Sequence, residues 1–195
     1  LPYTTLQVRS ATLEDSEGTH RVTFDEPLPK DLREGDVLGN ASRAPRLRMT
    51  GCTVRLNRAR GVLCQTRDAV IEKCTFDRCT GPGVMVLTEI VYFHESIGTR
   101  DVTVRDNRFI NCNEGAASSN APLMAMAWLK DFALPPHPGV HRNVRLIGNL
   151  IQGADGPAIF AAGVAGLTVQ KNVFSDICRR PPSPEDAYAI RVINC

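Results

Sequence analysis

The chain has 195 residues, of which 43% are hydrophobic, so it is long enough to bury a substantial core. It carries 23 basic and 21 acidic residues, a formal net charge of +2. This balance argues against binding to nucleic acid or to an anionic membrane, both of which favour a strong or clustered positive charge. No stretch approaches eighteen uncharged apolar residues, so we expect no membrane span.

Residues 1–44 differ in pattern from the rest of the chain. Apolar and polar residues alternate in 6–13, 20–24 and 36–38, and the segments Pro27-Leu-Pro29 and Arg33-Glu-Gly35 separate these runs. We expect a small β-barrel-like module here, or part of one. Since strand-like runs stand at both ends of the sequence, we also expect the chain to be a piece of a longer polypeptide.

A repeat begins at Pro45. Five ten-residue segments align without gaps, and the third, fifth and tenth positions of each are apolar, Ala69 being the smallest. Such alternation predicts strands with one buried face. A further strand-like run, such as Val62–Cys64, follows the tenth position after a bend that contains glycine. The aligned segments are 45–54, 67–76, 100–109, 142–151 and 165–174.

The eighth position of the repeat holds cysteine twice and then asparagine three times: Cys52, Cys74, Asn107, Asn149 and Asn172. An asparagine that recurs once per coil can bond to the coils above and below it. We therefore expect these residues to form one interior ladder. The chain has seven cysteines without the spacing of a zinc site, and we interpret them as small apolar interior residues.

The spacing between repeats gives the architecture. The third positions, from Leu47 to Leu167, lie 22, 33, 42 and 23 residues apart, so a bare coil needs about 22 residues. Coils this short cannot bury their faces alone and must stack. The sequence predicts an all-β fold, a right-handed parallel β-helix of about five coils over residues 45–195. Loop insertions at 89–99 and 113–141 should lie side by side on one flank and carry function.

Several phrases support a family resemblance. They include Glu34-Gly-Asp-Val-Leu-Gly-Asn40, Asn57-Arg-Ala-Arg-Gly-Val62 and Tyr92-Phe-His-Glu-Ser96, and similar phrases continue in order to about residue 175. The chain resembles the β-helical α-galactosidases of glycoside hydrolase family 110. The resemblance implies removal of terminal α-1,3-linked galactose with inversion, no metal or organic cofactor, a glycan with terminal galactose as partner, and a secreted or periplasmic location. It specifies no oligomeric state.

Inverting hydrolysis needs two carboxyl groups, an acid and a base. Glu89 follows a predicted third strand and is the first choice for a catalytic acid or base, with a solvated loop residue as the alternative. Glu95 is the second choice. Glu114, one coil further on, is the third candidate, because from there it could face Glu89. The resemblance favours aspartate, often in an acidic pair, where Leu87-Thr-Glu89 stands, and glycine where Ile97 stands, which puts hydrolysis in question.

Aromatic residues surround these carboxylates in the sequence. Tyr92 and Phe93 are expected either to form a sugar-stacking wall or to pin their loop, and Trp128 either to stack on a sugar or to anchor the second insertion. His94 and Asp131 are predicted sugar contacts. The sequence lacks the stacked aspartates that would hold calcium in a β-helical lyase, so we expect no metal. The alternative to an enzyme is a non-catalytic β-helix that binds glycan or only supports an assembly.

Overall fold

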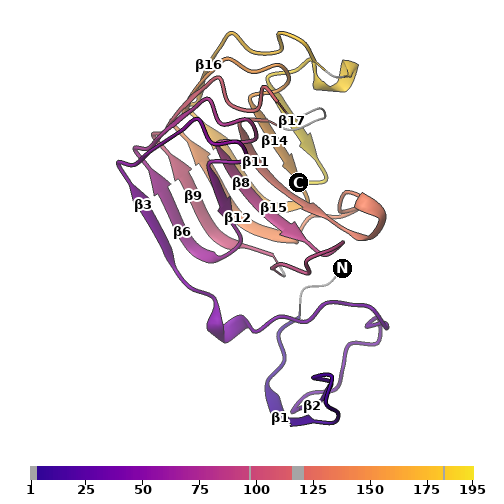
Figure 1. Cartoon of the computed structure of the whole chain (residues 1–195). Helices are drawn as coiled ribbons and strands as arrows, with labels where there is room; N and C mark the ends of the chain where they lie inside the picture. The colour runs from indigo at the N-terminus through magenta and orange to yellow at the C-terminus, as the bar shows by residue number, and fades with distance from the viewer. Residues whose placement is uncertain (1–3, 97, 116–120, 182) are drawn as a thin grey trace.

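The structure, a computed structural model, describes residues 4–96, 98–115, 121–181 and 183–195. It confirms the predicted right-handed parallel β-helix. Figure 1 shows the stacked strands as one body and the two-stranded hairpin at the N-terminal end apart from it. In the described residues no helix is long and apolar enough to cross a membrane.

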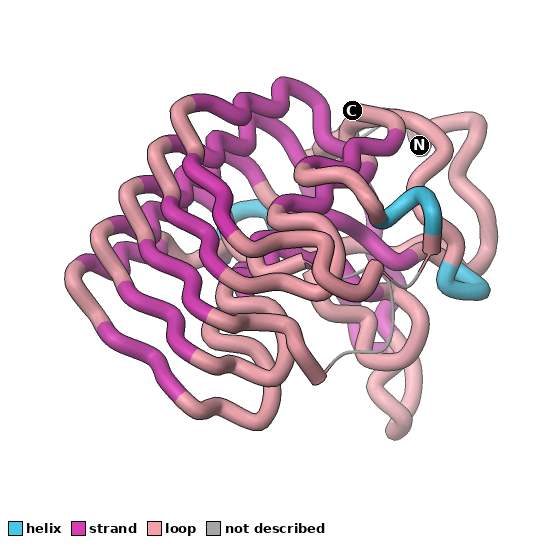
Figure 2. The backbone as a smooth tube through the Cα atoms, turned by 90° about the horizontal axis from the view of Figure 1, so that it is seen from above, coloured by secondary structure: helices cyan, strands magenta, loops and turns pink. Residues whose placement is uncertain are grey.

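Each of the five coils contributes one strand to each of three parallel sheets, and Figure 2 shows the coils stacked one above the other. The first sheet consists of β3 (Leu47–Thr50), β6 (Arg67–Glu72), β9 (Arg100–Arg105), β12 (His141–Ile147) and β15 (Val164–Gln170). The second consists of β4 (Thr53–Arg55), β7 (Thr75–Asp77), β10 (Arg108–Ile110), β13 (Leu150–Gln152) and β16 (Val173–Ser175). The third consists of β5 (Val62–Cys64), β8 (Val84–Glu89), β11 (Leu123–Trp128), β14 (Ile159–Ala162) and β17 (Ile190–Ile193).

The apolar repeat positions form vertical stacks inside the coils. The third repeat positions pair in register through all five coils, and so do the tenth positions. In the tenth-position stack the rings of Phe76 and Phe109 lie 5.1 Å apart at 20°. Residues of the middle coils are fully buried, whereas Leu47 and Leu167 in the outer coils are half-buried because one neighbour is missing.

The predicted asparagine ladder is present. The Asn149 Oδ1 atom accepts from the main-chain N and the Nδ2 of Asn107, and the Asn172 Oδ1 atom accepts from the same two groups of Asn149. The ladder continues to the main-chain N–H of Cys74, which donates to Asn107 Oδ1 at 2.9 Å. Cys74 is buried, but Cys52 in the outermost coil is exposed. The eighth repeat position therefore lies in the interior from the second coil onward, but not in the first coil.

Corners of successive coils also repeat. Asp68, Asp101 and Asn143 occupy the second position of their repeats, and all three have a positive φ of 51–54°. Aspartate and asparagine tolerate this left-handed conformation better than most residues. The side chain of Asn143 donates to Asp101 one coil away, so the corners are joined to one another.

The N-terminal residues form less structure than expected. In place of a barrel-like module, residues 4–44 contain one antiparallel hairpin of β1 (Val8–Leu13) and β2 (His20–Phe24), followed by a short 3-10 turn at Ala41–Arg43. Every residue of β1 is exposed. Two strands cannot close a barrel or shield a core, so this hairpin buries almost nothing.

The predicted second insertion, 113–141, is not all loop. It contains β11, the third strand of its coil, which pairs in register with β8. The added residues therefore precede and follow β11, and a 3-10 turn at Lys130–Phe132 belongs to the later part. Residues 116–120 of the predicted insertion lie outside the described residues.

The outer face of the third sheet carries a second apolar cluster, distinct from the interior. Met85 and Leu87 on β8 and Met124 and Met126 on β11 point outward yet are almost fully buried. Because side chains alternate along a strand, Glu89 and Trp128 at the ends of these strands lie on the same face. This face leads directly to the candidate site.

Candidate functional site

The candidate site lies at the edge of the third sheet where β8 and β11 end. Glu89 and Trp128, the last residues of the two strands, are register partners, so the segments that follow them start side by side. The ring of Tyr92 packs edge-on against that of Phe132 at 5.6 Å, and the N–H of Ile90 donates to the Trp128 carbonyl at 3.4 Å. The predicted packing of the first insertion against the second is confirmed at these contacts.

Glu89 organises the first of these segments. Glu89 is buried, with 6% of its surface exposed, and its carboxylate accepts three main-chain N–H bonds from the turn that follows it. Val91 and Tyr92 donate to Oε1 at 2.5 and 2.8 Å, and Phe93 donates to Oε2 at 2.9 Å. Burial by itself raises the pKa of the Glu89 carboxyl, but the three N–H bonds and the nearby His94 ring outweigh it and hold the pKa below its usual value. Glu89 is therefore ionised at neutral pH.

Glu95 is the main-chain partner of Glu89. The two residues form an antiparallel bridge in which Glu95 N donates to Glu89 O at 2.7 Å and Glu89 N donates to Glu95 O at 3.1 Å. Cα atoms in such a pair lie about 5.5 Å apart. The Glu95 side chain is exposed, and its Oε2 accepts from Gln65 Nε2, one coil away, at 3.1 Å. The edge thus holds one buried and one exposed carboxylate on paired backbone.

Aromatic rings cover this edge. Tyr92 is 71% exposed, Phe93 is 74% exposed and Phe132 is 50% exposed. Trp128 is half-buried and packs edge-on against Phe132 at 6.0 Å, so the rings form a connected cluster. Tyr92 and Phe93 bury little of their own surface against the solenoid, which favours the wall interpretation over the pin interpretation.

A cavity of about 240 Å³ lies beside the bridge. Its walls come from the chain before the first coil, from the coil edge at Gln65–Arg67 and from the loop that carries His94; polar members include Asn40, Thr66 and Ser96. The volume is below the roughly 300–1,000 Å³ typical of drug-sized ligands, so the cavity suits one sugar ring rather than an oligosaccharide. His94 is thereby placed next to Glu95 at a lined cavity.

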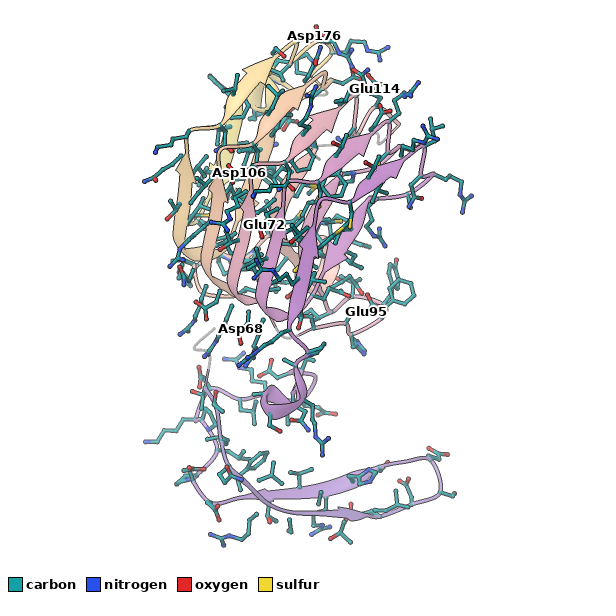
Figure 3. All side chains as sticks on the ribbon, turned by 90° about the vertical axis from the view of Figure 1, so that its left-hand side faces the viewer. Asp68, Glu72, Glu95, Asp106, Glu114 and Asp176 are labelled. Atoms are coloured by element: carbon teal, nitrogen blue, oxygen red, sulfur yellow. The ribbon has the colours of Figure 1, made fainter. Side chains whose placement is uncertain are left out.

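Glu114 does not face Glu89, and that prediction is wrong. Gly115 lies against Thr80, before the start of β8, whereas Glu89 ends the same strand. A six-residue strand separates its two ends by roughly 16–20 Å. Figure 3 shows Glu114 near the upper ends of the stacked strands and Glu95 near their lower ends. Glu114 instead forms an ion pair with Arg179.

Asp131, another predicted sugar contact, is not brought into the cavity. Asp131 is exposed in the 3-10 turn after β11 and has a left-handed φ of 58°. Ile97, where the resemblance favours glycine, lies outside the described residues. Among the residues the structure describes, no group of three or more His, Cys, Asp or Glu side chains could hold a metal ion.

His141 matters more to the edge than its sequence position indicated. It is fully buried; its Nε2 lies 2.8 Å from the Met126 carbonyl, and its Nδ1 accepts from the Thr99 N–H at 3.3 Å. Burial lowers the pKa of His141 to about 4, so the ring is neutral with its proton on Nε2. It ties the ends of both insertions to the coil. Only its place directly before the repeat signalled this role.

Thr88, the residue before Glu89, points into the coil. It is 3% exposed, and its hydroxyl has no hydrogen-bond partner in the described parts of the chain. The hydroxyl residue that stands in place of the second acid of the pair therefore faces the interior, and the outward carboxylate is that of Glu89.

The stacked coils and the loops along one edge define the chain as a right-handed parallel β-helix protein with its candidate site on loops. A family model described as "Right handed beta helix region" matches residues 31–125. Alpha-1,3-galactosidase A of Akkermansia muciniphila is 28% identical over 98% of this chain and 30% of its own length. Alpha-1,3-galactosidase B of the same organism is 31% identical over 77% of this chain and 19% of its own length.

Alpha-1,3-galactosidase A of Bacteroides fragilis is 28% identical over 95% of this chain and 31% of its own length. These matches confirm the resemblance found in the sequence: the chain is similar over most of its length to α-1,3-galactosidases A and B, at 28–31% identity. It spans less than a third of the length of each of these three relatives.

Proposed function

We propose that the chain acts on glycans that end in α-1,3-linked galactose and that it serves their hydrolysis as an inverting, exo-acting α-galactosidase does. The observation that carries this proposal is the backbone pairing of Glu89 with Glu95 beside the exposed aromatic cluster. The names of the relatives supply the sugar and the linkage. The galactose ring would occupy the cavity next to His94, with the rest of the glycan along the aromatic rings.

The two carboxylates would take different roles. An inverting enzyme needs an ionised base that removes a proton from water and an acid that protonates the departing glycosidic oxygen, with carboxyl groups roughly 6.5–9.5 Å apart. Glu89 is ionised, which suits the base. A carboxylate has about four lone-pair sites, and three N–H bonds occupy three of them, so one site on Oε2 is left for a water proton. Glu95, which is exposed, would be the acid.

The test uses the disaccharide galactose-α-1,3-galactose and the full chain. Proton NMR should detect β-galactose first, because inversion converts the α-linkage to the β-anomer. Glu89→Gln and Glu95→Gln should each lower the rate at least about a hundredfold, the lower end of general acid–base contributions. Glu17→Gln in the exposed hairpin is the matched control. Unchanged turnover in Glu89→Gln would remove Glu89 from the mechanism.

A second function, glycan binding without hydrolysis, is favoured by a specific observation. The Glu89 carboxylate already accepts three main-chain N–H bonds, an arrangement that would fix the loop even if Glu89 had no part in hydrolysis. In this case the disaccharide would stabilise the chain in a thermal-shift titration while no galactose is released, and Tyr92→Ala would abolish the stabilisation. Release of galactose would contradict it. Under both proposals we expect a secreted or periplasmic location, because the family resemblance implies it, and cell fractionation tests this.

A further inference from the structure

A second cavity, of about 260 Å³, lies on the outer face of the third sheet, and the proposed function does not use it. Arg58 and Arg60 line one side, and Met85 and Trp128 line the other. We call it the arginine pocket. The remaining lining residues are Ala59, Thr80, Gly81, Pro82 and Gly115.

The bend that carries the two arginines is built rigidly. The Asn57 side chain closes the turn, since its Oδ1 accepts from Ala59 N and its Nδ2 donates to Arg60 O, both at 3.1 Å. The bend is also bonded to the next coil, because Gly81 N donates to the Ala59 carbonyl at 2.8 Å. The backbone beneath both guanidinium groups is therefore held before any ligand arrives, which lowers the entropic cost of binding.

The charge of the pocket is not neutralised by the protein. Both arginines are exposed, and within the described ranges of the chain neither forms an ion pair. The facing wall is apolar, because Met85 is buried and Trp128 presents its indole. Two planar guanidinium groups beside an apolar wall suit an oxyanion on a ring-shaped, partly apolar molecule, since arginine binds carboxylate and sulfate in a bidentate manner.

Trp128 connects the arginine pocket to the candidate site. Its indole lines the pocket and also packs against Phe132, whose ring contacts Tyr92. The arginine pocket and the aromatic cluster therefore share the Trp128 side chain. Because the two ends of β8 lie roughly 16–20 Å apart, an acidic group that reaches Arg58 and Arg60 belongs to a sugar several units from the terminal galactose.

We propose that the arginine pocket is a subsite for an anionic sugar, one that carries a sulfate ester or a carboxylate, within glycans whose terminal galactose is held at the β8–β11 edge. The preference for terminal galactose rests on the proposed function, whereas binding of the acidic sugar rests on the pocket itself. A sulfated or uronic galactan is thus the substrate class that this chain fits best.

Titration calorimetry of the full chain at low salt tests the proposal with galactose 6-sulfate, galacturonic acid and neutral galactose-α-1,3-galactose. At least one of the acidic sugars should bind. Arg58→Gln and Arg60→Gln should each weaken it by about tenfold, the loss expected for one charge-assisted contact. Arg55→Gln, an exposed arginine of the same coil outside the pocket, should leave the affinity unchanged. Added salt should weaken binding to the wild type and leave little effect in the double variant.

The arms of the experiment separate the outcomes. Preference for galactose 6-sulfate identifies a sulfate subsite, and preference for galacturonic acid identifies a carboxylate subsite; either supports the proposal. Binding of the neutral disaccharide without binding of either acidic sugar overturns the arginine pocket and leaves the proposed function standing. Binding of acidic sugars that depends on Arg58 and Arg60, without binding of the disaccharide, supports the pocket and contradicts the proposed function. An equal loss of affinity for the acidic sugars in Arg55→Gln would mean that general surface charge, and not the pocket, binds them, and it would overturn the proposal.

Discussion

Replacing Asn149 with leucine tests the ladder that holds the coils together. Asn149 is 1% exposed and makes four side-chain hydrogen bonds. Its Oδ1 accepts from Asn107 N at 3.1 Å and from Asn107 Nδ2 at 3.0 Å, and its Nδ2 donates to the Val104 carbonyl and to Asn172 Oδ1, both at 3.0 Å. Leucine is similar in size, so the lost free energy should come from unpaired polar groups rather than from a cavity.

Two of the partners keep another bond after this replacement. Asn107 Nδ2 still donates to Ile71 O, and Asn172 Oδ1 still accepts from the main-chain N of residue 149. The Asn107 N–H loses its side-chain acceptor, and the Val104 carbonyl loses its side-chain donor. At about 1–3 kcal/mol for each of these two buried groups, Asn149→Leu should lower the free energy of unfolding by about 2–6 kcal/mol.

Urea unfolding followed by circular dichroism measures this loss, and Asn172→Leu is the internal comparison. Asn172 makes three of the four equivalent bonds, and it is half-buried in the last coil, where water can replace them, so its loss should be about 1 kcal/mol. An equal loss for the two variants would refute the reasoning, because it would mean that burial of the ladder does not set the cost.

Three other predictions concern the edge. The wild type should lose stability, by about 3 kcal/mol at most, as the pH falls from about 6.5 to 4, because His141 gains a proton in the unfolded chain but stays neutral in the folded one. His141→Gln should remove this loss, and thermal unfolding at a series of pH values measures it. Gly98→Ala should lower the melting temperature clearly more than Gly18→Ala does, because both glycines have positive φ but only at Gly98 would a Cβ lie 2.0 Å from the Val140 carbonyl; equal shifts would contradict this. Fluorescence of Trp128 should be constant from pH 7 down to 4.5, the ordinary pKa of a glutamate carboxyl, and should change only at lower pH, when Glu89 is protonated and the contact of its loop with Phe132 and Trp128 weakens. Glu89→Gln should lack this change at acidic pH.

Most of the solenoid was predictable because its signals are local and repeated. Inward positions such as Ala69, Val102 and Val144 recur at fixed places in the repeat, and the structure pairs them in register. The third strand of the middle coil, β11, was not predicted because extra residues displace it from its place in the repeat. Leu123 follows the tenth repeat position, Phe109, by 14 residues, whereas the third strands of the first, second and fourth coils start eight residues after theirs.

The site was predictable in part, and its errors follow from that missed strand. With β11 unplaced, Glu114 seemed to leave the coil at the same edge as Glu89, although it lies before the strand and Glu89 lies after one. Tyr92 and Trp128 were singled out in the sequence as sugar-stacking or anchoring residues, but Phe132, whose ring contacts both, was not. The three N–H bonds to Glu89 depend on the turn geometry at Val91–Phe93, which no sequence pattern encoded.

The loop anchor constrains both proposed functions in the same way. Because an ionised carboxylate accepts N–H bonds more strongly than a protonated carboxyl group, Glu89 holds the loop that carries Tyr92 and Glu95 most firmly above its lowered pKa. An ionised Glu89 cannot donate the proton that the glycosidic oxygen needs, so the proposed hydrolysis assigns that step to Glu95. Acidification below the lowered pKa of Glu89 should then weaken hydrolysis and sugar binding together, since it protonates the base and loosens the loop that carries the aromatic wall. Loss of hydrolysis at a pH where the disaccharide still binds would separate the two, and would place the catalytic base on a residue other than Glu89.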